Sequence, residues 1–139
     1  MAKNSKTFSF EFFPPKTASG QEKVISLGKE FESVPAEYYS VTFGAGGSTQ
    51  QGTIDTCRSL FNATKVPIAP HISGIGSDKS SIKSMLQLYK DEGFKKLVVL
   101  RGDLPSGFGS VGDFPYAINL IEFINESFEN YFEIEVGAY

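Results

Sequence analysis

Five short apolar segments recur along the chain, each bounded by proline, glycine or polar residues. They span residues 8–13, 38–43, 68–72, 97–100 and 132–138, with starts 30, 30, 29 and 35 residues apart. Apolar residues at helical spacing lie between them: Val24, Leu27, Phe31 and Val34; Ile54, Cys57 and Phe61; Ile82, Met85, Leu86 and Tyr89; and Ala117, Leu120, Ile121, Ile124 and Phe128. The pattern predicts strands and helices in the order β-α-β-α-β-α-β-α-β.

Two boundary signals agree with this order. Ser48, followed three residues later by Gln51, predicts a capping box at the start of the second helix. Gly93 predicts the end of the third helix, because glycine commonly follows the last helical residue.

A strand–helix–strand repeat of about 30 residues predicts parallel strands joined by right-handed crossovers. An open doubly wound sheet and part of an eightfold barrel both fit that repeat. Alternation along the strands favours the barrel, because it delivers one polar side chain per strand to the carboxyl end. These side chains are Glu11, Thr42, His71, Arg101 and Tyr139.

We therefore predict an α/β fold, the N-terminal half of a (β/α)8 TIM barrel, with residues 1–139 forming one incomplete barrel domain of about four and a half βα units. Eight repeats need roughly 250 residues, so we expect the chain to be a fragment of a longer product.

Composition narrows the functional classes. Thirteen Lys and Arg against 16 Asp and Glu give a formal net charge of −3, which argues against a nucleic-acid or anionic-membrane partner. The single cysteine, Cys57, excludes an intrachain disulfide framework and a cysteine-based zinc site, and it favours a reducing, cytoplasmic location. Apolar runs of the roughly 20 residues that span a bilayer are absent from the sequence.

Glu11 is the leading candidate for acid–base chemistry. Phe12, Phe13, Pro14 and Pro15 follow it, so the strand ends beside the carboxylate at an apolar rim that suits a general acid. An exposed glutamate on an edge strand explains the pattern equally well. His71 is the only histidine, which leaves little for a metal cluster or a Ser-His-Asp triad. It is either a structural histidine or a hydrogen-bond partner for a ligand carbonyl or phosphate.

Two glycine-rich segments also invite a functional interpretation. Residues 44–49 follow the second strand, where successive backbone amides can bind an anion, although a plain turn fits as well. Residues 107–112 match G-x-G-x-x-G but stand too far from the preceding strand for a dinucleotide fingerprint, so we interpret them as a lid.

Four motifs together resemble methylenetetrahydrofolate reductase. They are Phe8-Ser9-Phe10-Glu11-Phe12-Phe13-Pro14-Pro15-Lys16, Ser40-Val41-Thr42-Phe43-Gly44-Ala45-Gly46-Gly47-Ser48-Thr49, Pro70-His71 and Leu100-Arg101-Gly102-Asp103-Leu104-Pro105. The resemblance implies a (β/α)8 barrel with non-covalent FAD that reduces 5,10-methylenetetrahydrofolate to 5-methyltetrahydrofolate with NAD(P)H. It also implies a place in one-carbon metabolism and methionine biosynthesis, and a homo-oligomer is expected.

The same resemblance assigns residues. Glu11 takes the place of the general acid that protonates the folate N10, and Asp103 lies near both flavin and folate. The positions that fall on flavin contacts are Thr42, His71, Leu100, Arg101, Gly102, Asp103, Tyr116, Ala117 and Tyr139. No metal ligand is expected.

Two other functions stay open at this stage. The first is a flavin-free lyase or hydrolase that uses Glu11 and Asp103 as a carboxylate pair. The second is a non-enzymatic half-barrel that self-associates to cover its open edges.

Overall fold

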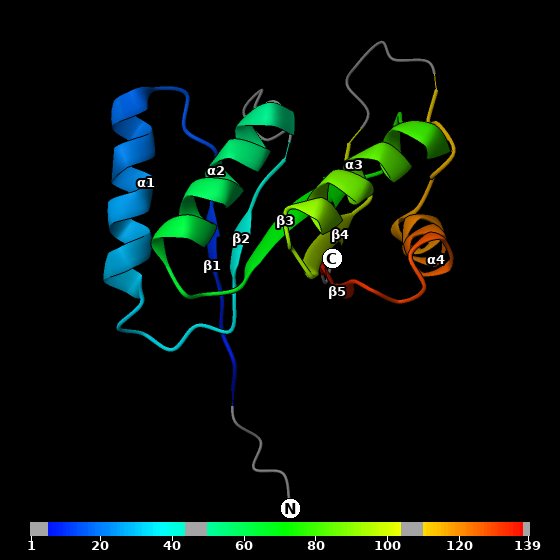
Figure 1. The fold of residues 1–139 in the computed structure, drawn as a ribbon. Helices are drawn as coiled ribbons and strands as arrows, with labels where there is room; N and C mark the ends of the chain where they lie inside the picture. Colours follow the sequence, from blue (N-terminus) through cyan, green and yellow to red (C-terminus); the bar gives the residue numbers. More distant parts are fainter. Residues whose placement is uncertain (1–5, 44–49, 104–109, 138–139) are drawn as a thin grey trace, which may run out of the picture. The chain divides into compact units, whose positions relative to one another are not determined.

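The computed structural model describes residues 6–43, 50–103 and 110–137. Within them the elements follow the predicted order: β1 (Phe10–Phe12), α1 (Ala18–Phe31), β2 (Tyr39–Val41), α2 (Gln50–Ala63), β3 (Ile68–Ser73), α3 (Lys79–Asp91), β4 (Lys96–Leu100), α4 (Ala117–Ser127) and β5 (Glu133–Val136) (Figure 1). The strands form a sheet in the order β1-β2-β3-β4-β5. The pairs β1–β2, β3–β4 and β4–β5 are parallel. The predicted α/β fold with alternating helices is confirmed, and part of a barrel is consistent with it.

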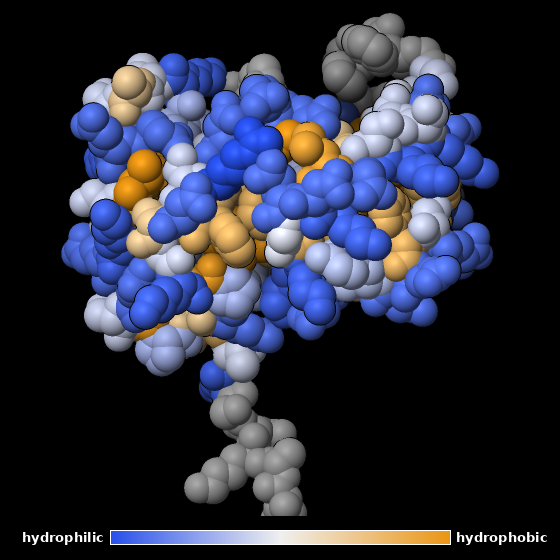
Figure 2. Space-filling view, viewed as in Figure 1, coloured by the Kyte–Doolittle hydropathy of each residue, from blue (hydrophilic) through white to orange (hydrophobic). Residues whose placement is uncertain are grey.

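Contacts between Cα atoms divide the chain into two compact units, residues 1–69 and 70–139. Each unit has its own buried apolar core. The outward surfaces of the helices in Figure 2 are largely hydrophilic, with apolar residues interspersed. This arrangement follows from the amphipathic stripes in the sequence, which turn one face of each helix toward a strand.

The core of the first unit is aromatic. The Phe10 ring stacks on Phe31 of α1 at 4.5 Å between centroids, and Phe12 meets Tyr39 edge-on at 5.2 Å. Tyr39 is fully buried, and its hydroxyl donates to the Gly28 carbonyl at 2.8 Å. A Cβ at Gly28 would come within 2.6 Å of Leu60 Cδ2, so this glycine permits α1 and α2 to pack closely.

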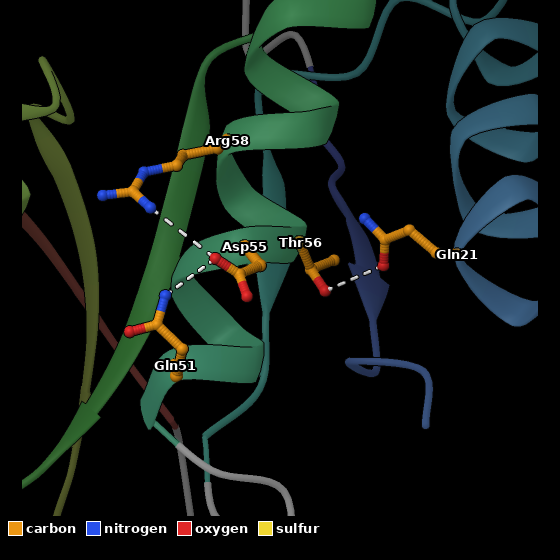
Figure 3. A network of polar contacts seen from close by, with 5 residues as sticks. All are labelled: Gln21, Gln51, Asp55, Thr56 and Arg58. Carbon is orange, nitrogen blue, oxygen red and sulfur yellow. Dashed lines mark hydrogen bonds and ion pairs between the residues drawn. The ribbon is translucent and has the colours of Figure 1, made fainter. Parts of the chain in front are cut away.

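Polar contacts also stabilise α2 (Figure 3). Asp55 Oδ1 accepts a hydrogen bond from Gln51 Nε2 at 2.8 Å, and it forms an ion pair with Arg58 at 3.6 Å. Such contacts three and four residues apart support a helix. The Thr56 hydroxyl reaches the Gln21 side chain at 3.5 Å, which links α2 to α1.

The second unit packs α3 and α4 against β4 and its neighbours. All four residues of the predicted α3 stripe are buried, and Leu120, Ile124 and Phe128 of the α4 stripe are buried with them. On the opposite face, Lys96 and Glu133 lie opposite each other in the β4–β5 register and form an ion pair at 3.1 Å. The sheet of this unit therefore has an apolar face toward the helices and a mixed, polar face away from them.

The boundaries differ from the sequence expectation in a few places. Val34 lies beyond the end of α1 and is 38% exposed, so it does not continue the α1 stripe. In α2 the buried position is Leu60, while Phe61 is 45% exposed, because the face in contact with the unit's core includes Thr53, Ile54 and Cys57. Gly93 follows α3 with a φ of +88°, as predicted. Ser48 lies outside the described residues.

The start of α3 yields a pH prediction. Asp78 caps this helix, and the bonds from the Ser81 backbone N–H and then the Ser81 hydroxyl hold the pKa of Asp78 below its ordinary value. The stabilisation is present above the unfolded pKa of about 3.9 and is lost as pH falls through the lowered folded value. Asp78→Asn keeps a capping oxygen without a charge. In urea unfolding, we expect the free energy of unfolding of the wild type to exceed that of Asp78→Asn at about pH 6, and this excess to disappear as the pH falls to about 2. An excess that stays constant over that range of pH would contradict the prediction.

Candidate active site

In the first unit, Glu11 and Thr42 lie on the same face of the β1–β2 pair. Glu11 is opposite Ser40 in the register, and Thr42 follows Ser40 by two residues. Paired residues of neighbouring strands share a face, and side chains two residues apart along a strand return to it. The Thr42 N–H donates to the Phe12 carbonyl at 3.0 Å, so the pairing continues past the end of β2.

Both the N–H and the carbonyl of Thr42 make hydrogen bonds. Besides that N–H bond, its carbonyl accepts a buried hydrogen bond from the Thr53 hydroxyl of α2 at 2.9 Å. The side chain is nearly inaccessible, at 6% exposure, and among the described residues its own Oγ1 has no hydrogen-bond partner. A buried hydroxyl in that state suits a polar ligand atom or a bound water.

Glu11 is exposed in the first unit. Phe12 is buried on the opposite face, toward Phe31 and Tyr39, whereas Phe13 is 62% exposed. Of the apolar rim that the sequence suggests, only Phe13 alternates onto the same face as Glu11.

In the second unit, a pocket of about 670 Å³ opens at the carboxyl end of β4. Its described lining residues are Val99, Leu100, Arg101, Gly102, Asp103, Ala117, Val136 and Gly137. Five of them, Leu100, Arg101, Gly102, Asp103 and Ala117, are residues that the family resemblance assigns to flavin binding. A volume of this size is typical of sites for small molecules and cofactors.

The segment after β4 is fixed by its hydrogen bonds. The Arg101 carbonyl accepts from the Ser73 hydroxyl and the Ile75 N–H, each at 3.0 Å, and the Arg101 Nε donates to the Pro115 carbonyl at 2.8 Å. That last bond uses one of the five N–H groups of the guanidinium. Among the described lining residues of the pocket, the charged side chains are those of Arg101 and Asp103.

The remaining predicted site residues are placed differently. His71 is buried in β3 and lies opposite Val98, and it is absent from the described lining of the pocket. Tyr116 is also absent from that lining and is 63% exposed at the start of α4. Tyr139, the loop at 44–49 and residues 107–109 of the G-x-G-x-x-G motif lie outside the described residues.

Burial excludes the Cys57 thiol as a nucleophile. It raises the pKa of the Cys57 thiol far above its ordinary value, and the side chain is fully buried, so this cysteine is inert at neutral pH. Among residues 6–43, 50–103 and 110–137, we find no group of three or more His, Cys, Asp or Glu side chains placed to hold a metal ion. Within the same ranges, no helix is long and apolar enough to cross a membrane.

Comparison with known proteins decides the family. The model of the family described as methylenetetrahydrofolate reductase matches residues 1–139. The chain belongs to the methylenetetrahydrofolate reductase family. It is 34% identical to methylenetetrahydrofolate reductase 2 of Schizosaccharomyces pombe and 33% identical to methylenetetrahydrofolate reductase (NADH) 1 of Arabidopsis thaliana, with 95% of the chain covered in each case.

The chain spans only part of these reductases, 21% of the fission yeast protein and 23% of the plant protein. Among solved structures, PhdJ bound to a substrate intermediate matches 94% of the chain and 43% of its own length, with a TM-score of 0.61 and 11% identity. At that identity the likeness shows the fold alone.

Two residues that the sequence analysis does not single out support the predicted ones. Thr53 holds the carbonyl of Thr42, and Ser73 holds the carbonyl of Arg101. For Thr53 the available signal is a threonine within the buried face of α2. For Ser73 it is the alternation that places it two residues after His71, on the same face.

The Thr53 contact yields a stability prediction. Thr53→Val keeps the shape but leaves the buried Thr42 carbonyl without this donor, so we expect it to lower the free energy of unfolding by about 1–2 kcal/mol. Thr56→Val is the matched control, because Thr56 is equally buried on the same helix but makes only a 3.5 Å contact. Urea unfolding of the complete protein measures both, and equal losses would contradict the assigned role of Thr53.

Gly102 is the basis of a second stability prediction. It has a φ of +82°, and a Cβ there would collide with Ser73 Oγ and lie 2.7 Å from Ile75 Cγ2. Gly76 has a similar φ of +75° but open space around it. Gly76→Ala should therefore cost only the left-handed strain, about 1 kcal/mol, and Gly102→Ala at least about 1 kcal/mol more. Urea unfolding again measures the difference, and similar costs would show that the neighbouring segment yields easily.

Proposed function

We propose that the complete protein reduces 5,10-methylenetetrahydrofolate to 5-methyltetrahydrofolate, with NAD(P)H as reductant and FAD as cofactor. Family membership supports the reaction, and the name of the plant relative, which specifies NADH, supports the nicotinamide reductant. The observation that carries the proposal is the pocket at the end of β4, since five of the nine residues that the resemblance assigns to flavin line it.

The described residues fit a flavin nucleotide. The pocket combines apolar walls from Leu100, Ala117 and Val136 with the guanidinium of Arg101. An aromatic ring system with polar edges and a charged phosphate chain needs such a mixture. When bound, FAD would supply hydride transfer between NAD(P)H and the folate.

We assign the residues of this chain as follows. Leu100, Arg101, Gly102, Asp103 and Ala117 hold the cofactor, and Asp103 also contacts the folate. Thr42, His71, Tyr116 and Tyr139 contribute further flavin contacts, on the strength of the family resemblance. Asp103, as a carboxylate, can accept hydrogen bonds from N–H groups of flavin or folate.

Glu11 is the proposed catalytic acid. Its exposure on the polar face of β1 leaves the carboxyl accessible to a substrate. As the five-membered ring of the folate opens, the Glu11 carboxyl gives its proton to N10, and the one-carbon unit on N5 becomes an iminium that accepts the hydride. Such proton transfer contributes roughly 10²- to 10⁴-fold to a rate.

The cellular setting follows from the same resemblance. We propose a cytoplasmic, homo-oligomeric enzyme of one-carbon metabolism and methionine biosynthesis, in which residues 1–139 form the first part of a single barrel domain. One buried cysteine in the whole chain is compatible with a reducing compartment.

Replacing Glu11 by Gln tests the acid role. In the complete protein loaded with FAD, Glu11→Gln should lower the rate of folate reduction by at least about 10²-fold, because the amide cannot supply the proton. Reduction of the flavin by NADH requires no such proton and should stay within about twofold of wild type. Stopped-flow absorbance of the flavin separates the two half-reactions.

The matched control is Glu22→Gln, an exposed glutamate on α1. It should leave both half-reactions unchanged. Full folate turnover by Glu11→Gln would refute the acid role. A wild-type protein that binds no FAD would refute the cofactor assignment and favour a flavin-free barrel enzyme.

A further inference from the structure

The Arg101 carbonyl is engaged by two donors from the segment after β3. The Ser73 hydroxyl and the Ile75 N–H both donate to it at 3.0 Å. A carbonyl oxygen has two lone pairs, so both are used. The peptide that joins Arg101 to Gly102 is thereby fixed in orientation.

The same serine fills the space beside Gly102. A Cβ at Gly102 would collide with Ser73 Oγ, and the backbone there has a φ of +82°. The Ser73 hydroxyl therefore lies against the Gly102 backbone, where a side chain would otherwise stand. Gly102 joins Arg101 to Asp103, the two charged residues among the described lining of the pocket.

Ser73 acts on the pocket through the Arg101–Gly102 peptide. It is absent from the described residues that line the pocket, whereas Arg101, Gly102 and Asp103 all line it. Two other backbone bonds, from Gly76 N to Val111 O at 2.9 Å and from Asp113 N to Ser77 O at 3.0 Å, join residues 76–77 to residues 111–113 independently of Ser73. The bond from Ile75 N to Arg101 O likewise joins the segments that follow β3 and β4 without Ser73. Loss of the Ser73 hydroxyl should thus leave the segments in contact and loosen the Arg101–Gly102 peptide.

We propose that Ser73 is a positioning residue for the cofactor: through the Arg101 carbonyl, its hydroxyl sets the directions in which Arg101 and Asp103 meet the bound flavin. The inference rests on the proposed function, since it assumes that the pocket binds FAD. It goes beyond that function because it assigns a role to Ser73, which is not among the described residues that line the pocket.

FAD titration of the complete apoprotein tests the inference. Ser73→Ala should raise the dissociation constant of FAD about five- to tenfold, the usual effect of one lost hydrogen bond, and should shift the visible absorption bands of the bound flavin. Ser73→Thr keeps the hydroxyl and should restore wild-type affinity to within about twofold. The control is Ser33→Ala, because the Ser33 hydroxyl also donates to a backbone carbonyl at 3.0 Å, that of Glu30 in the other unit. It should change neither quantity.

The outcomes separate the inference from the proposed function. Wild-type affinity and an unshifted flavin spectrum in Ser73→Ala overturn the positioning role alone. Failure of the wild-type apoprotein to bind FAD overturns the proposed function and the positioning role together. If Ser73→Ala does not fold, the FAD affinities of Ser73→Thr and Ser73→Val are compared instead, because the two side chains have nearly the same shape and only threonine carries a hydroxyl. Equal FAD affinity in that pair overturns the inference, and weaker binding by Ser73→Val supports it.

Discussion

Side chains alternate between the two faces of the paired parallel strands, and this alternation gives each unit one apolar face and one more polar face. In the first unit it sends Phe10, Phe12 and Tyr39 toward the helices and leaves Glu11, Ser40 and Thr42 on the other face. In the second unit it buries Ile72, Leu97 and Val99 and places His71 on the opposite face. Apolar burial against the helices stabilises each unit, and the polar face is free to carry chemistry because it contributes little to that burial.

The polar face is useful only if its backbone is held in place, and in both units a hydroxyl does so. Thr53 donates to the carbonyl of Thr42, and Ser73 donates to the carbonyl of Arg101. In each case a candidate ligand-binding residue at a strand end is fixed through its main chain, although the Arg101 side chain also gives one of its N–H groups to the Pro115 carbonyl. The candidate site is thus supported by residues that need not contact a ligand themselves.

Much of the fold could be predicted from the sequence, because strands and helices of this kind are specified by local patterns. All four residues of the α3 stripe are buried, and Gly93 follows the end of that helix. The burial of Leu60 in α2, in place of Phe61, could not be predicted from the sequence, because it depends on a close approach to Gly28 in another helix.

The candidate site was predictable in part for the same reason. Leu100, Arg101, Gly102 and Asp103 are adjacent in sequence, and the end of β4 brings them to one pocket. Thr53 and Ser73 act over sequence separations of 11 and 28 residues, and no local pattern marks such contacts. The exposure of Tyr116 likewise depends on how the segment before α4 packs, which the motif alone does not specify.

If the carboxyl ends of the strands form the ligand-binding face, amide hydrogen exchange of the complete protein should change there when FAD is added. We expect slower exchange on FAD binding in the peptides that contain Thr42 and Leu100–Asp103, and unchanged exchange at the opposite end of β4, around Lys95 and Lys96. Protection confined to that opposite end, or to the outer faces of the helices, would contradict this placement of the ligand-binding face.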